Sequence, residues 1–154
     1  MADDSVVPVS AGEVFVSLTR LRIRYRRHLP IFVLQSLRSA RQARAASGNL
    51  AVSLLADRDR TYWTRSLWSD ERAMRAFMMS GVHRSAMRKL AAWCNEASVA
   101  HWTQATAQLP SWEEAYRRMQ GEGRRSKVNH PSPQHEAFQI AVPMVRASRE
   151  LRFK

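Results

Sequence analysis

His83 is the residue whose type and position most directly offer chemistry. It follows Ser80-Gly81, where the helical pattern of "SDERAMRAFMMSGVHRSAMRKLAAW" stops and starts again. An imidazole at such a restart can ligate a metal or a haem iron, or act as a general base near neutral pH. The break predicts that His83 turns toward a pocket as the catalytic residue or an axial haem ligand. The alternative is a histidine hydrogen-bonded near the start of a helix.

Large aromatic and methionine side chains offer the walls of such a pocket. Side chains of this kind pack into ordinary cores. In a cleft between a sheet and helices, however, they also line cavities for apolar ligands. We predict that a lipophilic or haem-type ligand binds between sheet and helices and contacts Trp63, Trp68, Phe77, Met87 and Trp102. The alternative is that these side chains only pack in the core.

A basic stretch precedes these residues in the chain. Arg20, Arg22 and Arg24 alternate along a predicted strand, so their side chains share one face. Guanidinium groups bind carboxylates through paired hydrogen bonds. We predict that Arg20 and Arg22 bind the carboxylate or propionate groups of the ligand. Two alternatives are a solvated rim and a pairing with Glu96 or Asp70 across a dimer.

The remaining reactive side chains predict less. His101 alternates with Trp102 in a strand, which favours a core or interface position. Cys94 has no histidine–carboxylate neighbours in the sequence and is expected to be a buried thiol. As the only cysteine, it excludes an internal disulfide and a cysteine-rich metal site. Gly-rich phosphate loops, nucleophile elbows and paired carboxylates are missing, which argues against kinases and hydrolases.

The elements that position these residues follow from hydrophobic periodicity. Strands are predicted at 14–25, twice within 50–68, and at 96–105; helices are predicted at 29–49 and across the broken segment after Trp68. The order β-α-β-β-α-β predicts an α+β, ferredoxin-like fold, in which a four-stranded antiparallel sheet carries both helices on one face. In the first strand the apolar positions change parity midway, which predicts a bulge or a change of environment.

The chain divides into three parts. Residues 1–12 are predicted to be a flexible N-terminus and residues 13–106 the ferredoxin-like domain. Residues 107–154 are predicted to hold a helix at 110–119, opened by a capping box from Ser111 to Glu114, and an extended tail. This C-terminal part is expected to pack on the domain or on a partner subunit.

A sheet with helices on one face leaves its other face bare. Partly apolar strands exposed to water favour association. Covering this face with the same face of a second copy gives a two-fold dimer, the commonest closed assembly. The sequence therefore predicts a homodimer.

The segment "YWTRSLWSDERAMRAFMMSGVHRSAM" (62–87) resembles the dimeric α+β barrels of the antibiotic-biosynthesis-monooxygenase-like superfamily. The stretches "SLTRLRIRY" and "WCNEASVAHW" extend the resemblance over residues 13–105, and the nearest group is that of the carotenoid-oxidising spheroidene monooxygenase. It implies a pocket between sheet and helices in each protomer. Phe77 stands where many members carry a histidine, and Met87 or Trp93 stands where haem-degrading members place their axial histidine.

Charge and hydropathy limit the possible binding partners and the location of the protein. The formal net charge is +12, and residues 14–56 contain eight arginines and no acidic residue. Such a field attracts phosphates, carboxylates or anionic surfaces. Apolar runs long enough to span a membrane do not occur, and a cytoplasmic location is expected.

Three functions remain open. The first is a monooxygenase-like protein that binds a lipophilic or haem-type ligand, because the fold resemblance and the predicted pocket agree. The second is a small-molecule binding or sensor protein of the same fold, without turnover. The third is a basic surface protein for nucleic acid, although the sequence carries no recognisable nucleic-acid-binding motif.

Overall fold

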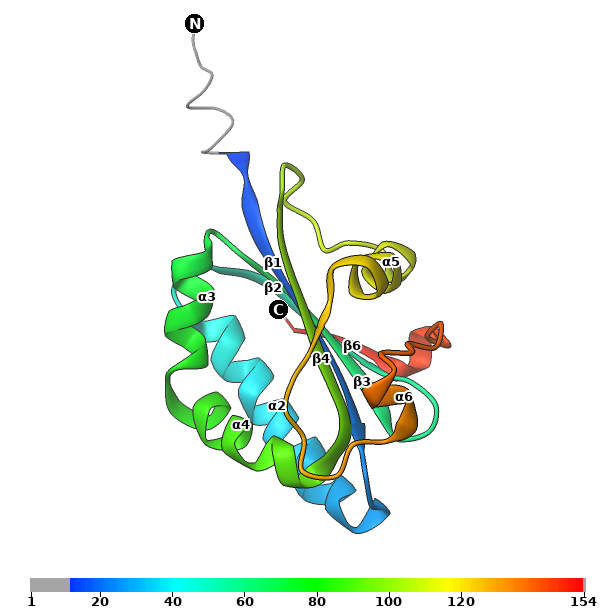
Figure 1. The fold of residues 1–154 in the computed structure, drawn as a ribbon. Coiled ribbons are helices and arrows are strands. Elements are labelled where there is room, and N and C mark those ends of the chain that lie inside the picture. Colours follow the sequence, from blue (N-terminus) through cyan, green and yellow to red (C-terminus); the bar gives the residue numbers. More distant parts are fainter. Residues whose placement is uncertain (1–11, 154) are drawn as a thin grey trace, which may run out of the picture.

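The chain adopts the predicted α+β, ferredoxin-like fold in a computed structural model that describes residues 12–153 (Figure 1). The predicted flexible terminus, 1–12, lies outside the described residues except for Gly12. The β-α-β-β-α-β order is confirmed, with the second helix in two parts. These elements are β1 (Val14–Ile23), α2 (Leu29–Ala45), β2 (Asn49–Ala56), β3 (Thr61–Trp68), α3 (Glu71–Met78), α4 (Gly81–Trp93) and β4 (Cys94–Gln104).

The antiparallel sheet has two more strands than predicted. Its order is β5-β4-β1-β3-β2-β6. The edge strand β5 (Arg124–Arg125) pairs with β4, and β6 (Glu150–Phe153) pairs with β2. Both additions come from the C-terminal tail. Strands of two and four residues are too short to show the alternation by which the central strands are recognised.

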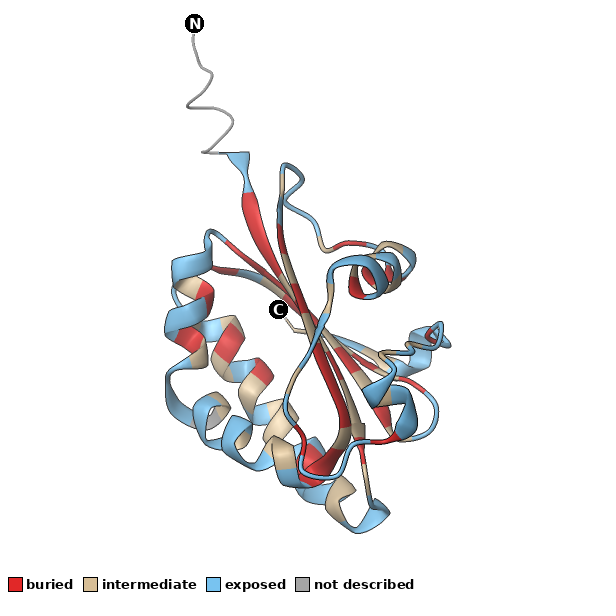
Figure 2. Cartoon of the chain, viewed as in Figure 1, coloured by how far each residue is buried: buried red, intermediate tan, exposed pale blue. Residues whose placement is uncertain are grey.

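One face of the sheet carries α2, α3 and α4, as predicted (Figure 1). Buried residues concentrate on the strands and on the sides of α2 and α3 turned toward the sheet (Figure 2). A short 3-10 helix, η1 (Arg26–His28), leads from β1 into α2. Among the described residues, no helix is long and apolar enough to cross a membrane.

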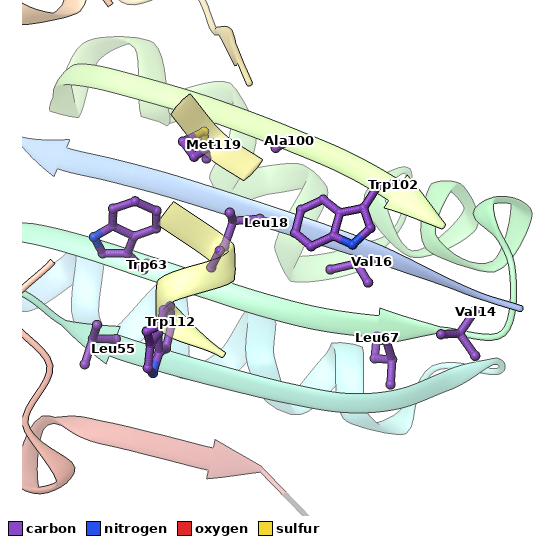
Figure 3. Packing of buried hydrophobic residues seen from close by; sticks show 11 residues of the cluster. Val14, Val16, Leu18, Leu55, Trp63, Leu67, Ala100, Trp102, Trp112 and Met119 are labelled. Carbon is purple, nitrogen blue, oxygen red and sulfur yellow. The ribbon is translucent and has the colours of Figure 1, made fainter. Parts of the chain in front are cut away.

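The opposite face is not bare, and this corrects the premise from which the homodimer is predicted. α5 (Trp112–Glu122) lies on it and buries Trp112, Ala115 and Met119. Figure 3 shows Trp112 and Met119 near Leu18, Trp63 and their neighbours on the central strands. An amphipathic helix of the same chain thus removes from water the surface that a second sheet would otherwise cover.

The parity change in β1 has the same origin. Val14, Val16 and Leu18 point into the α5 side, whereas Phe15 packs among residues of α2 and α3 on the other side. The pairing with β4 is regular until an irregularity between Arg22 and Ile23, at the end of β1. The apolar positions therefore change parity because both faces are covered, and no bulge interrupts the middle of the strand.

Buried polar contacts fasten the C-terminal segment to the sheet. Arg65, on β3, donates to Glu150 at 2.5 Å, to Ser53 at 3.1 Å and to the carbonyl oxygen of Pro110 at 2.5 Å. Glu150 also accepts from the indole of Trp112 at 3.1 Å. The same carboxylate therefore connects β3, α5 and β6. Two further short elements, α6 (Pro133–Glu136) and η2 (Ala147–Arg149), lie in this segment.

Candidate functional site

A cavity of about 460 Å³ lies between the helix-bearing face of the sheet and α2, α3 and α4. Its floor consists of strand residues on one face of the sheet: Ser17, Thr19, Leu21, Val52, Leu54, Thr64, Ser66, Trp68, Ala97, Val99 and His101. Helical residues form the roof: Phe32, Gln35, Ser36, Ser39, Ala40, Ala43, Met74, Phe77, Met78, His83, Ala86, Met87, Leu90, Ala91 and Trp93. Residues Arg124, Arg125, Ser126 and Lys127 complete one edge. This volume is within the range of about 300–1,000 Å³ that is common for small-molecule sites.

The break between α3 and α4 is built around Gly81 and Gln42. Gly81 has φ +56°, and a Cβ placed there would lie 2.7 Å from Nε2 of Gln42. That amide donates to the carbonyl oxygen of Ser80 at 2.9 Å, and its oxygen accepts from the backbone N–H of His83 at 3.1 Å. Gln42 of α2 therefore bridges both sides of the break and orients the first turn of α4 toward the cavity.

His83 lines the cavity with its imidazole against Phe77. The two ring centroids are 4.3 Å apart, and Nδ1 is buried without a hydrogen-bond partner. Burial lowers the pKa of His83 below its ordinary value, and the backbone of Met78 counteracts this in part. The imidazole is therefore neutral near pH 7.

His101 also lines the cavity, although a core or interface position is predicted for it. Its register partner on β1 is Ser17, and its ring lies 5.4 Å from that of Phe15. Among the described residues its side chain makes no hydrogen bond. Burial, together with the charge of Arg124, lowers the pKa of His101. A neutral imidazole without a hydrogen-bond partner is suited to accept a proton from a bound molecule.

Hydroxyl groups, which are not among the predicted site residues, lie at the centre of the floor. Ser17 pairs with Ser66, and Thr19 pairs with Thr64, across β1 and β3. Ser66 accepts from the indole of Trp68 at 2.9 Å, whereas the other three hydroxyls have no hydrogen-bond partner within residues 12–153. Ser17 and Thr19 alternate along β1, as Thr64 and Ser66 do along β3, and this spacing is the sequence signal by which the polar patch could have been found.

The structure separates the predicted site residues into two groups. His83, Trp68, Phe77 and Met87 line the cavity. The other four, Arg20, Arg22, Trp63 and Trp102, lie on the α5 side of the sheet or at its end, and none lines the cavity. Alternation along a strand is the reason, because neighbouring positions point to opposite faces.

The two arginines bind a carboxylate of this chain. Arg20 donates to Glu96 at 2.8 Å, and both side chains are almost fully buried. Arg22 lies 3.5 Å from the same carboxylate, which also accepts from Ser132 at 2.7 Å. The placement of Arg20 and Arg22 at a ligand is thus corrected: they pair with Glu96, as one of the alternatives has it, but within one chain. Trp63 likewise donates to Asp57 at 3.0 Å.

Cys94 is a buried thiol, as expected. Burial raises its pKa to about 12, so the thiol stays protonated and is a poor nucleophile. Within residues 12–153, no group of three or more histidine, cysteine or acidic side chains is placed to hold a metal ion.

Together, the sheet and the broken helix define a ferredoxin-like α+β protein with a cavity between the sheet and its helices. The chain belongs to the family described as "Domain of unknown function (DUF3291)", whose model matches residues 25–150. Comparison with curated protein sequences finds no significant match.

Solved structures share the fold. A Nitrosomonas europaea protein of unknown function is 17% identical with a TM-score of 0.55, over 66% of this chain and 98% of its own. A candidate antibiotic biosynthesis monooxygenase from the same organism is 11% identical with a TM-score of 0.54, over 59% of this chain and 89% of its own. A further antibiotic biosynthesis monooxygenase is 13% identical with a TM-score of 0.52, over 57% and 95%. The predicted resemblance to this superfamily is confirmed at the level of the fold.

Proposed function

We propose that this protein binds a lipophilic small molecule in the cavity and oxidises it as a monooxygenase-like enzyme. The observation that carries the proposal is the cavity of about 460 Å³, in which apolar side chains lie beside hydroxyl groups and a neutral imidazole. Apolar walls bind the ligand by removing it from water, and the few polar groups orient it. An imidazole held neutral by burial can take a proton from an acidic C–H or O–H of the ligand.

We assign the base to His101. Its side chain faces the cavity without a hydrogen-bond partner among the described residues. His83 is the second candidate, because its Nδ1 also lacks a partner. That nitrogen is buried, however, and the Phe77 ring packs against the same imidazole, so a bound molecule reaches Nδ1 only after the side chain moves.

The contacts predicted to hold haem through His83, Arg20 and Arg22 are not assembled in the described conformation. An axial ligand needs a ring nitrogen open to the iron. The unpartnered Nδ1 of His83 is buried, and the Phe77 ring packs against the same imidazole with centroids 4.3 Å apart. The arginines expected to bind propionates, Arg20 and Arg22, are paired with Glu96 on the other side of the sheet. We therefore propose that the ligand binds without haem.

The alternative is a non-catalytic sensor that binds its ligand in the same cavity. Such a protein needs the apolar cavity walls but does not need a histidine that acts as a base. A nucleic-acid surface has less support. Two of the eight arginines in residues 14–56 are paired with Glu96, and Arg44 donates to the backbone and side chain of Asn49 at 3.3 Å. Part of the basic run therefore stabilises the fold and is unavailable to phosphates.

A homodimer belongs to the proposal with one change of geometry. Because α5 covers the face that was expected to be bare, a second copy would pack on α5 and the C-terminal tail. Exposed apolar residues of this tail, Val142, Met144 and Val145, support such a contact. Multi-angle light scattering at several protein concentrations tests it. A monomer at every concentration would contradict the homodimer and leave the cavity proposal intact.

The function is tested with two probes. Nile red, a neutral lipophilic dye, reports binding, and anthrone offers an acidic CH₂ group that oxygen converts to a carbonyl with release of water. We expect Ala86→Trp, which fills the roof, to weaken Nile red binding at least tenfold. His101→Gln should keep Nile red binding and lose oxygen-dependent formation of anthraquinone, whereas His83→Gln should keep both. Binding without turnover supports the sensor, and absence of binding refutes the cavity as a ligand site.

A further inference from the structure

One edge of the cavity carries positive charge only. The strand β5 and the two residues after it run along this edge, and Arg124 pairs with Val99 of the cavity floor. Arg124, Arg125 and Lys127 all line the cavity. No aspartate or glutamate is among the described residues that line it. The electrostatic potential at this edge is therefore positive.

Of these three cations, Arg124 and Lys127 make no side-chain hydrogen bond among the described residues. Arg124, Arg125 and Lys127 are exposed, whereas the buried Arg20 and Arg65 are paired with Glu96 and Glu150. Within residues 12–153, no carboxylate lies within ion-pair distance of Arg124, Arg125 or Lys127. Arg125 makes one backbone contact, to the carbonyl oxygen of Glu136 at 2.8 Å. The charge of Arg124 is also effective inside the cavity, since it contributes to the lowered pKa of His101.

We propose that the cavity takes a lipophilic anion: an apolar body lies against Trp68, Phe77 and Met87, and a carboxylate or phosphate group lies at Arg124 and Lys127. The inference rests on the proposed function, because it uses the same cavity and specifies the chemical class of its ligand. An anionic group satisfies guanidinium and ammonium donors with charge-assisted hydrogen bonds. A neutral ligand leaves these exposed charges to the solvent alone.

The experiment compares chain-matched probes by isothermal titration calorimetry: decanol, decanoate and decyl phosphate. The alkyl chain is constant, so the difference reports the head group. We expect both anions to bind about tenfold more tightly than decanol, given the modest strength of exposed ion pairs. Added salt should weaken the binding of the anions and leave that of decanol unchanged. A preference for decanoate over decyl phosphate, or the reverse, identifies which anion the edge favours.

Matched variants locate the effect. Arg124→Gln with Lys127→Gln should weaken decanoate binding about tenfold and leave decanol within about twofold. Arg117→Gln removes an exposed charge from α5, on the other side of the sheet, and should change neither probe. Ala86→Trp should weaken both probes, because it fills the shared cavity.

The outcomes separate the two proposals. If neither decanol nor Nile red binds, the proposed function fails. If decanol binds as tightly as decanoate, or if the double variant leaves their ratio unchanged, the lipophilic-anion inference fails alone. Binding of phosphatidylserine vesicles without binding of decanoate would also overturn it, since the edge would then act as a membrane-facing surface.

Discussion

Glu150→Gln tests how firmly the C-terminal segment is held on the sheet. The Glu150 carboxylate accepts from Arg65 at 2.5 Å, from Ser53 at 2.7 Å and from Trp112 at 3.1 Å. The Arg65 side chain is 2% exposed and lies with its guanidinium 3.9 Å above the Trp112 ring. Replacing the carboxylate by an amide keeps the shape of the side chain and leaves the buried guanidinium without its counter-charge.

The expected loss of stability is large for a single substitution. Removing one partner of a buried ion pair costs about 3–5 kcal/mol, because the other charge remains buried. The lower end applies here, since Arg65 keeps its contacts with Ser53 and the carbonyl oxygen of Pro110. With an m value of about 1.5 kcal/mol/M, a loss of about 3 kcal/mol lowers the urea midpoint by about 2 M.

Urea unfolding followed by tryptophan fluorescence measures this effect against a matched control. Glu71→Gln breaks an exposed pair with Arg75, in which the side chains are 49% and 70% exposed, and should cost at most about 0.5 kcal/mol. Arg65→Met combined with Glu150→Leu removes both charges and should regain most of the loss. Equal midpoints for Glu150→Gln and Glu71→Gln would refute the idea that this ion pair secures α5 and β6.

Four further outcomes are expected. Gly81→Ala should lower the free energy of unfolding by about 1–2 kcal/mol, because φ is +56° and the new Cβ meets Gln42, whereas Gly121→Ala in α5 has open space and should not destabilise. Burial lowers the pKa of His83 and of His101 in the folded state. The stability that these neutral histidines contribute is therefore complete above the ordinary pKa of 6.5 and is lost as the pH falls below it. In thermal melts between pH 7 and 5, the variant with asparagine at both positions should lose less stability than the unmodified protein. Burial alone would raise the pKa of Glu150, but hydrogen bonds from Ser53 and Trp112 and the charge of Arg65 lower this pKa. The stability that the Glu150 carboxylate contributes is therefore present above the ordinary pKa of 4.5 and is lost in more acidic solution. Acid titration of the Glu150→Gln variant should lack this loss. Cys94, with its pKa raised to about 12, should resist Ellman's reagent at pH 8 in the native state and react once urea unfolds the chain.

The order of elements was predictable because their periodicities are distinct. Alternation marked the central strands, and the helical pattern with Ser80-Gly81 in its middle marked the division into α3 and α4. The covering of the second sheet face was not predicted. The amphipathic pattern of 110–119 shows that one side of this helix is buried, but it does not show on which surface. Leu18 and Leu21, on opposite parities of β1, were a sign that both faces are covered.

The site was predictable only in part, for a related reason. Alternation tells which strand residues share a face, and it grouped Arg20 with Arg22 correctly. It does not tell which face holds the cavity, and that depends on the layer formed by distant helices. His101 and Trp102 show the consequence: adjacent in the chain, one lines the cavity and the other packs on the α5 side. For Trp68, Phe77 and His83, on the helix-bearing side, the local pattern and the three-dimensional position agree.

One face of the sheet contributes mainly to stability, and the other face carries the cavity. On the α5 side, the large buried side chains and both buried ion pairs lock the C-terminal segment in place. On the other side, hydroxyls and an imidazole occupy floor positions that a plain core would fill with apolar side chains. Leaving polar groups without partners on a half-buried surface costs stability unless a ligand satisfies them. The ion-paired face offsets that cost, so the sheet can carry polar side chains on its cavity floor and remain folded.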